Sequence, residues 1–249
     1  MSRFYDAPVP AGSVALYWLG QAGFLLKTAD GRTVMIDPYL SNCCERFFGF
    51  RRLMAPTLSP TELLPDVLLI THAHYDHLDI DSVPALMAAG QTQMWCAQDV
   101  RGEAAKLGLS TERITYLHPG DVQVNDWLRV TAIACDHGEP APDALGFLIE
   151  LDGKRIYLAG DTAFRPDIFA QECLRNVDVF IAPINGAFGN LNEQQAADAA
   201  RLVAPGTTVP CHFWNFAEHR GDPILFMNAM QERGLHYTLL QAAGAPLLI

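Results

Sequence analysis

Residues 67–77 read Val67-Leu68-Leu69-Ile70-Thr71-His72-Ala73-His74-Tyr75-Asp76-His77, and this stretch decides the fold. Four consecutive apolar residues indicate a buried strand, and the segment after them places three imidazoles and a carboxylate close together. Neutral imidazole is the commonest protein ligand for zinc and similar ions, and a short loop at a strand end can aim several side chains at one point. Unrelated surface histidines are the alternative, but these residue types seldom match at this spacing by chance. We therefore predict a metal-binding loop.

The size and composition of the chain are those of one globular domain. It has 249 residues, of which 50% are hydrophobic and 18% are charged, so we expect a single domain over residues 1–249. The formal net charge of −11 argues against nucleic acid as a partner unless a local basic patch overrides it. An apolar run typical of a signal peptide or a membrane span is not apparent. We expect a cytoplasmic protein that does not bind membranes.

The cysteines are expected to be reduced. The sequence has 6 of them, without a Cys-x-x-Cys pair, and we interpret them as small, mostly buried hydrophobic residues.

Alternating and continuous apolar runs predict the elements of the first half. Strands are expected at 14–18, 24–28, 33–36, 67–70, 94–97 and 114–117, and helices at 82–89, capped by Ser82 and ending at Ala89, and at 99–107. Two further strands turn at Asn125-Asp126 and end at Cys135.

The second half continues the alternation of strands and helices. Strands are expected at 147–151, 155–159, 177–181, 207–211 and 237–241, and helices at 165–175, 192–203 and 223–232. A composition shift that would mark a linker is not apparent. Two β-rich halves, each with helices outside, predict a four-layer α/β/β/α sandwich.

Three residues far from the histidine loop, His137, Asp161 and His212, each follow the end of an expected strand. Such ends can converge on one rim, so we expect these side chains to complete a centre for two metal ions. Counting candidates assigns His72, His74 and His137 to one ion, Asp76, His77 and His212 to the other, and Asp161 to a bridge between them.

This set of residues resembles the metallo-β-lactamase superfamily. Its His-x-His-x-Asp-His motif is matched by His72, His74, Asp76 and His77, and its later ligands by His137, Asp161 and His212. The resemblance implies the α/β/β/α fold and a hydroxide held between two metals.

Two neighbouring cations lower the pKa of a shared water and stabilise the oxyanion that forms when it attacks, so hydrolysis is the expected reaction. Oxygen and nitrogen ligands suit manganese or zinc, with iron as a further option. Asp76 and Asp161 are the candidate catalytic residues. Asp161 is the expected bridge, and Asp76 can also orient the hydroxide or carry a proton to the leaving group.

Several further residues have two possible interpretations each. Asp37 either accepts a hydrogen bond from a ligating imidazole or is an ordinary turn carboxylate. His219 either lines the mouth of the site or is a solvated loop residue. Arg46, Arg51 and Arg52, in a Phe-rich segment expected to be a loop, either bind an anionic group of the substrate or are solvated.

Other segments are similar to one branch of the superfamily, the L-ascorbate-6-phosphate lactonase (UlaG-type) family. They are Trp18–Phe24, Ile36–Ser41, Pro183-Ile184-Asn185-Gly186, Gly189–Glu193 and His212–Pro223. The similarity implies manganese-dependent opening of a phosphorylated sugar lactone, with Asn185 as a candidate substrate contact beside Arg51, Arg52 and His219. The small-molecule substrate is then anionic, and a homo-oligomer is expected from the frequency of symmetric assemblies.

Two alternatives stay open. A phosphodiesterase of the same superfamily, acting on nucleic acid or phospholipid, would want a basic arm or an apolar docking surface, which the sequence does not display. A metal-stabilised binding module would use closed coordination, which the number of candidate ligands disfavours. A dinucleotide site at Gly20-Gln21-Ala22-Gly23 is rejected, because a strand rather than a helix is expected to follow it.

Overall fold

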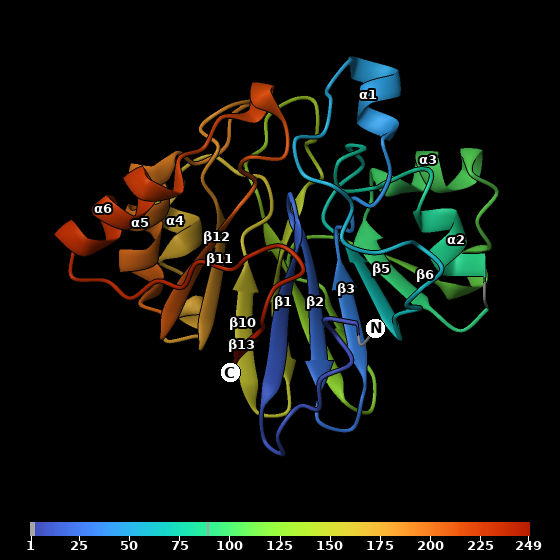
Figure 1. Cartoon of the computed structure of the whole chain (residues 1–249), viewed down its shortest axis with the longest axis horizontal. Coiled ribbons are helices and arrows are strands. Elements are labelled where there is room, and N and C mark those ends of the chain that lie inside the picture. Colours follow the sequence, from blue (N-terminus) through green and yellow to red (C-terminus); the bar gives the residue numbers. More distant parts are fainter. Residues whose placement is uncertain (1–2, 89) are drawn as a thin grey trace. The chain divides into compact units, whose positions relative to one another are not determined.

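The computed structural model describes residues 3–88 and 90–249, and the chain divides into two compact units (Figure 1). The first unit, which we call the N-terminal unit, comprises Met1–Leu117 and Leu240–Ile249. The second, the C-terminal unit, comprises His118–Leu239. Among the described residues, no helix combines the length and the apolar character that crossing a bilayer requires.

The N-terminal unit is built on a seven-stranded sheet with the order β13-β1-β2-β3-β4-β5-β6. The strands β13, β1, β2 and β3 pair antiparallel, whereas β3, β4, β5 and β6 are parallel. Their bounds are β1 Val14–Gly20, β2 Gly23–Thr28, β3 Thr33–Ile36, β4 Val67–Ile70, β5 Gln93–Ala97, β6 Ile114–Leu117 and β13 Leu247–Leu248. Parallel pairing of β3 and β4 brings their carboxyl ends to one edge of the sheet.

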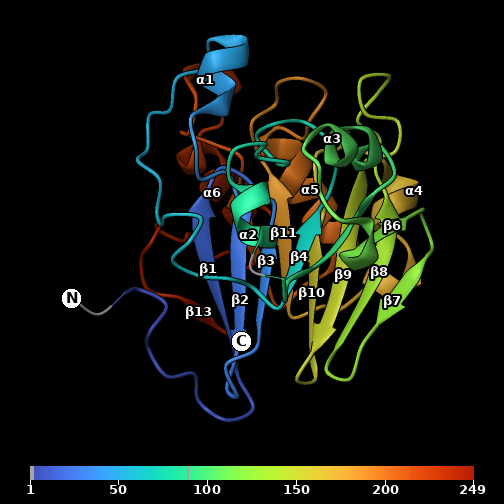
Figure 2. The ribbon, with the colours of Figure 1, turned by 90° about the vertical axis from the view of Figure 1, so that its right-hand side faces the viewer.

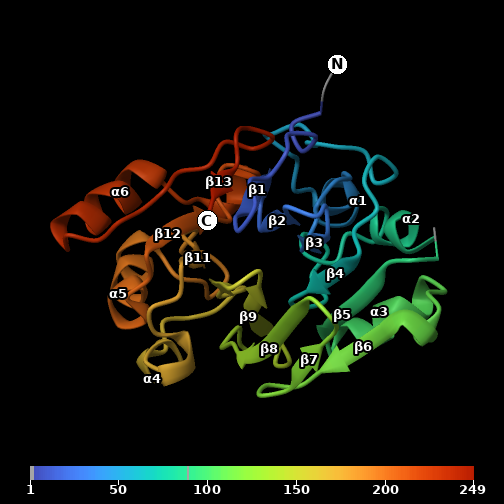
Figure 3. The ribbon, with the colours of Figure 1, turned by 90° about the horizontal axis from the view of Figure 1, so that it is seen from below.

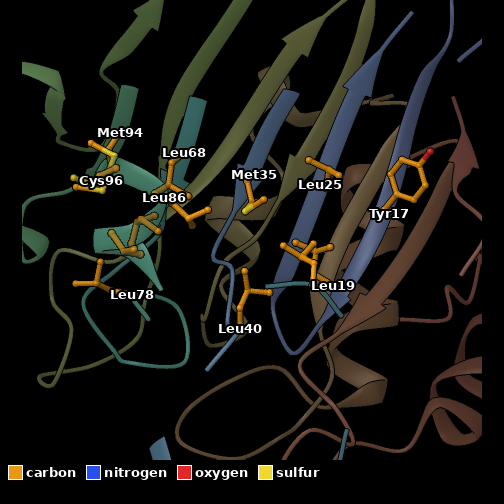
Figure 4. Close-up of a cluster of buried hydrophobic side chains, with 14 of the residues drawn as sticks. Tyr17, Leu19, Leu25, Met35, Leu40, Leu68, Leu78, Leu86, Met94 and Cys96 are labelled. Atoms are coloured by element: carbon orange, nitrogen blue, oxygen red, sulfur yellow. The ribbon is translucent and has the colours of Figure 1, made fainter. Parts of the chain in front are cut away.

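Three short helices accompany this sheet: α1 Cys43–Phe48, α2 Val83–Ala88 and α3 Val100–Lys106, with a 3₁₀ turn, η1, at Thr111–Arg113. Alternate strand residues such as Leu25, Met35 and Leu68 pack in one buried cluster with Leu86 of α2 and Val100 of α3. Figure 4 shows Leu86 close to Leu68 in this cluster. The helices α2 and α3 therefore cover the same face of the sheet (Figure 2).

The C-terminal unit contains a six-stranded sheet with the order β12-β11-β10-β9-β8-β7. The bounds are β7 Val122–Val124, β8 Leu128–Ala134, β9 Leu145–Leu151, β10 Lys154–Leu158, β11 Val179–Pro183 and β12 Thr207–Cys211. The strands β10, β11 and β12 are parallel, and β9 is antiparallel to both β8 and β10. The carboxyl ends of β8, β10 and β12 consequently share one edge.

Helices α4 Pro166–Phe169, α5 Glu193–Val203 and α6 Pro223–Glu232 lie beside β11 and β12, with α5 between the other two (Figure 3). The 3₁₀ turns η2 Glu172–Leu174 and η3 Ala217–His219 complete the unit. Asn192 caps α5 in a reciprocal pair of hydrogen bonds with Gln195, and the Asp222 carboxylate accepts from the first amides of α6.

Most of the expected elements are confirmed. The bounds expected for β4, β6, β12 and α6 are those observed, and the turn at Asp152-Gly153 joins β9 and β10 as predicted. The helix capped by Ser82 is observed as α2 to Ala88, and its expected last residue, Ala89, lies outside the described residues.

Three expectations are wrong. The helix expected over 165–175 is two short pieces, α4 and η2, because Gln171 between them leaves the helical conformation, with φ −59° and ψ 134°. The strand expected over 237–241 is reduced to a single bridge between Tyr237 and Thr208. Arg46 belongs to α1 rather than to a loop.

The cysteines follow the prediction in part. All are free thiols, and Cys43, Cys44, Cys96 and Cys211 are buried, but Cys135 is half-buried and Cys173 is exposed. Burial raises the pKa of Cys96, which keeps its thiol protonated. The single domain expected over 1–249 stays a prediction.

Candidate metal site

The histidine loop of the N-terminal unit begins where β4 ends, and its ligand candidates are largely buried. His72 and His77 are both 0% exposed, which is unusual for imidazoles unless their nitrogens are engaged. Nε2 of His72 lies 2.9 Å from Nδ1 of His74, so these two nitrogens face one point. Nε2 of His77 lies 3.6 Å from Oδ2 of Asp76. We call His72, His74, Asp76 and His77 the N-terminal donor group.

Asp37 orients this group through Thr71, at the carboxyl ends of the parallel strands β3 and β4. The Asp37 carboxylate accepts from the Thr71 amide at 2.8 Å and from the Thr71 hydroxyl at 2.6 Å. Oδ2 of Asp37 also lies 2.8 Å from Nδ1 of His77. The hydrogen bond expected between Asp37 and a loop imidazole is therefore present.

These contacts select the imidazole tautomers. Thr71 donates its only hydroxyl proton to Asp37, so the hydroxyl oxygen can accept a hydrogen bond from Nδ1 of His72, 3.0 Å away. His77 donates its Nδ1 proton to Asp37 in the same way. Both rings then keep the lone pair on Nε2, the atom that a metal ion would need.

Sequence reasoning missed Gln21, which lies in the turn between β1 and β2. Its Nε2 donates to Oδ2 of Asp76 at 2.8 Å, and Gln21 itself is 0% exposed. The carboxylate of Asp76 is thus held by a neutral donor. The available signals were a polar residue between two glycines and its place in Trp18–Phe24, a segment similar to the lactonase family.

The C-terminal unit brings His137, Asp161 and His212 together at the carboxyl ends of β8, β10 and β12. Oδ2 of Asp161 lies 3.2 Å from Nε2 of His212 and 3.8 Å from Nε2 of His137. All three residues are buried. Gly160, directly before Asp161, lets the chain pass close to β9, since a Cβ there would lie 2.5 Å from the carbonyl oxygen of Leu145. We call these three residues the C-terminal donor group.

Sequence reasoning also did not single out Asn190 within the segment Gly189–Glu193. Its Nδ2 donates to Oδ2 of Asp161 at 2.7 Å, and both side chains are buried. The loop that carries Asn190 is tied down by a hydrogen bond from the Leu191 amide to the Thr162 carbonyl, 3.0 Å long. The signal available in the sequence was its place in a segment similar to the lactonase family.

The residues expected to contact substrate have varied surroundings. His219 is 5% exposed, so the solvated alternative is wrong, and its ring stacks on His212 with 4.8 Å between ring centres. Asn185 is buried and donates to the carbonyl of Ala187 at 3.3 Å. Arg51 is exposed.

Arg46 and Arg52 have protein partners. Arg46 forms a bidentate ion pair with Asp81, at 2.7 and 2.9 Å, which raises the pKa of Arg46. Arg52 donates to the carbonyls of Tyr39, Ser41 and Met54, and burial lowers its pKa. These contacts give Arg52 a structural role, so the anion-binding prediction now applies chiefly to Arg51.

Within each unit, the donor atoms are spaced as metal ligands are. Two nitrogen or oxygen atoms that bind one tetrahedral zinc ion at about 2.0–2.1 Å lie roughly 3.3 Å apart. The observed separations of 2.9 Å in the N-terminal group and 3.2 Å in the C-terminal group are close to that value. The residues of each group therefore fit a divalent ion.

Comparison with known proteins identifies the family. A family model described as a beta-lactamase superfamily domain matches residues 32–213, which is more than half of the chain. The chain belongs to the beta-lactamase superfamily. The superfamily resemblance inferred from the histidine motif is thereby confirmed, whereas the lactonase branch stays a prediction.

Curated relatives within the superfamily match most of the chain. A UPF0173 metal-dependent hydrolase of Polynucleobacter asymbioticus is 28% identical over 239 residues, covering 88% of this chain and 81% of the relative. A UPF0173 metal-dependent hydrolase of Methanopyrus kandleri is 27% identical over 227 residues, covering 88% of this chain and 92% of the relative.

Solved structures show the same fold. The metallo hydrolase Igni18 of Ignicoccus hospitalis has a TM-score of 0.73 at 22% identity, covering 95% of this chain and 98% of its own. The metallo-beta-lactamase fold protein YhfI of Bacillus subtilis has a TM-score of 0.70 at 15% identity, with coverages of 95% and 98%. An isothiocyanate hydrolase from Delia radicum gut bacteria has a TM-score of 0.74 at 17% identity, covering 94% of this chain and 98% of its own. The predicted fold class is confirmed by these likenesses.

Proposed function

We propose that this chain is a metal-dependent hydrolase that acts on a small molecule. The observation that carries the proposal is the N-terminal donor group, in which Thr71 and Asp37 leave Nε2 of both His72 and His77 as lone-pair donors. Orienting hydrogen bonds of this kind typically accompany metal-binding imidazoles. The names of the curated relatives, metal-dependent hydrolases, support the same conclusion.

The proposal assigns two divalent ions, manganese or zinc with iron as a further option, to the donor groups. His72, His74 and His137 would hold one ion, Asp76, His77 and His212 the other, and Asp161 would be shared. When bound, such a pair supplies an activated water at neutral pH and stabilises charge that develops on the attacked oxygen. Closely spaced imidazole and carboxylate donors in each unit suit these ions.

The chain's own residues hold the donors in place and handle the proton. Gln21 and Asn190 each donate a carboxamide proton to one carboxylate, Asp76 and Asp161 respectively, which limits rotation of that carboxylate. Asp76 is the proposed carrier of a proton to the leaving group, since its carboxylate is 14% exposed whereas the His77 ring is fully buried.

For the bond that is cleaved, we propose the ester of a lactone ring, as the similarity of several segments to the lactonase family implies. A phosphodiester is the second candidate. Because one fold can support many different reactions, the substrate has to be inferred from the residues at the site. Asn185 and His219 are proposed substrate contacts, and Arg51 is the proposed contact for an anionic group.

A hydrolysis screen tests the proposal. The purified protein, loaded separately with manganese, zinc or ferrous iron, is assayed on a panel of lactones that includes L-ascorbate 6-phosphate, and on bis(4-nitrophenyl) phosphate. We expect turnover of a lactone, with a loss of at least about 100-fold in kcat/KM when His72 is replaced by Ala.

The matched control is His118→Ala, which removes an exposed histidine from a turn and should leave turnover unchanged. Turnover of the phosphodiester alone would favour the second candidate. Absence of turnover on every substrate with every metal would contradict the hydrolase proposal.

A further inference from the structure

Four aromatic side chains gather around helix α1 and the histidine loop in the N-terminal unit. The Tyr75 ring centre lies 5.2 Å from that of Phe47 and 5.6 Å from that of Phe48, and Phe48 lies 6.2 Å from Phe50. These separations are those of favourable aromatic pairs. We call Phe47, Phe48, Phe50 and Tyr75 the aromatic platform.

Two apolar members of the platform are exposed. Phe47 is 52% exposed and Phe48 is 56% exposed, and neither belongs to the buried cluster under the sheet. Figures 1 and 2 show α1 projecting beyond the ends of the strands in its own unit. Large apolar side chains that gather on a surface typically mark a binding site.

Specific contacts hold the platform in one position. Arg46 pairs with Asp81, and its guanidinium carbon lies 5.0 Å from the centre of the Phe47 ring. The Cys43 thiol donates to the Tyr75 carbonyl at 3.4 Å, and the Tyr75 hydroxyl donates to Glu103 at 3.3 Å. These contacts position Phe47 and Tyr75 before any ligand arrives, which lowers the entropic cost of binding.

The platform is continuous with the N-terminal donor group. Tyr75 stands between the ligand candidates His74 and Asp76 in the chain, so its backbone is joined directly to both. The same unit places α1 after β3 and the loop after β4, and these parallel strands end at the same edge. An apolar group resting on Phe47 and Phe48 would also contact the Tyr75 ring.

Two arginines near the platform already have protein partners, whereas Arg51, next to Phe50, is exposed and is the proposed contact for an anionic group. Asp81 engages Arg46, and three main-chain carbonyls engage Arg52, so an anion would have to displace existing partners.

We propose that the aromatic platform binds an alkyl or aryl substituent of the substrate, adjacent to the bond that is hydrolysed. The inference rests on the proposed function for the place of the reaction, but the binding itself does not need the metal. The inference adds an apolar substituent to the substrate, for which the sequence predicted only an anionic group.

Two δ-lactones with the same ring, δ-hexalactone with a methyl substituent and δ-undecalactone with a hexyl substituent, test this inference. Their dissociation constants are measured by saturation-transfer NMR on the metal-free protein, below the micelle concentration. A buried methylene contributes about fourfold in affinity, so partial burial of the longer chain should give a preference of at least about tenfold.

The variant Phe47→Ala/Phe48→Ala should lose most of this preference while binding the methyl lactone as the parent protein does. Ile224→Ala/Leu225→Ala is the matched control, because it removes two side chains that are 60% and 53% exposed on α6. The control should keep the preference. Equal melting temperatures of the variants and the parent protein would exclude misfolding.

Three results would overturn the inference. One is equal affinity for the two lactones, and another is a preference that survives in the Phe47→Ala/Phe48→Ala variant. The third is a parent protein that sediments as a dimer and a variant that sediments as a monomer, since a second copy would then cover the platform. Failure of the hydrolysis screen alone would remove the proposed reaction and leave these binding results as they are.

Discussion

At the scale of single residues, several members of the site region adopt a backbone conformation that side chains disfavour. Among them, Asp37 has a φ of 41° and His212 a φ of 61°. Residues other than glycine rarely occupy this region, and those that do are concentrated at functional sites. Each lies directly after a strand, β3 and β12 respectively, where the turn of the chain directs a side chain towards a donor group.

The proposed sharing of Asp161 leads to a prediction about metal content. Asp161→Ala should reduce bound metal at both sites, because it removes a ligand from each ion, whereas His77→Ala should chiefly empty one. Elemental analysis of the purified variants after loading and desalting measures the number of ions per chain.

His118→Ala is again the matched control and should retain the parent's metal content, since His118 is exposed. Two fully occupied sites in Asp161→Ala would refute the shared ligand. Loss of both ions in His77→Ala with retention in Asp161→Ala would reverse the two assignments.

At the scale of elements, one buried carboxylate joins the segment after β3 to the start of α2. Oδ2 of Asp79 accepts from the amides of Leu40 and Ser41, at 2.8 and 2.7 Å, and from the Ser82 hydroxyl at 2.7 Å. Oδ1 accepts from the Ser41 hydroxyl at 2.6 Å. This carboxylate fixes the segment that leads from the histidine loop into α2, and sequence reasoning did not single it out.

Replacing Asp79 by Ala should therefore destabilise the N-terminal unit strongly. The substitution leaves the buried amide of Leu40 and the half-buried amide of Ser41 without their acceptor, and an unsatisfied buried group costs about 1–3 kcal/mol. We expect the free energy of unfolding, measured by urea titration, to fall by at least about 3 kcal/mol.

Asp81→Ala is the comparison for this change. Asp81 forms a solvent-accessible ion pair with Arg46, and such pairs contribute roughly 0–1 kcal/mol. A similar loss of stability in both variants would show that Asp79 has no special role.

At the scale of the whole molecule, each unit has a sheet and buried apolar residues of its own, so the fold does not depend on metal for a core. The buried cluster of the N-terminal unit extends from Tyr17 on β1 to Ala104 on α3. In the C-terminal unit, Phe147, Tyr157 and Phe180 are fully buried. A metal-stabilised binding module would instead lose its structure without its ions.

Chelation should accordingly abolish activity while cooperative unfolding persists. A ligand present at 100 times its dissociation constant adds about 2.7 kcal/mol, which for a chain of this size lowers the melting temperature on removal by roughly 5–10 °C. Thermal melts followed by circular dichroism, with and without chelator, measure the shift. Complete loss of the transition in chelator would favour the structural-metal alternative.

Much of the architecture could be predicted from local sequence because burial leaves a local pattern. The apolar run Val67–Ile70 is β4, and α6 begins at the expected residue, Pro223, with Asp222 as its cap. The spacing of His72, His74, Asp76 and His77 likewise indicated metal chemistry, because four donors in one loop need no other part of the chain to be close together.

Contacts between distant residues were decided only by the tertiary structure. Gln21 reaches Asp76 across 55 residues and Asn190 reaches Asp161 across 29, and neither pairing has a local signature. Arg155 likewise reaches the carbonyls of Cys173 and Arg175 from a different element, β10. Periodicity records which face of a segment is buried, but the partner of a polar side chain depends on which strands become neighbours.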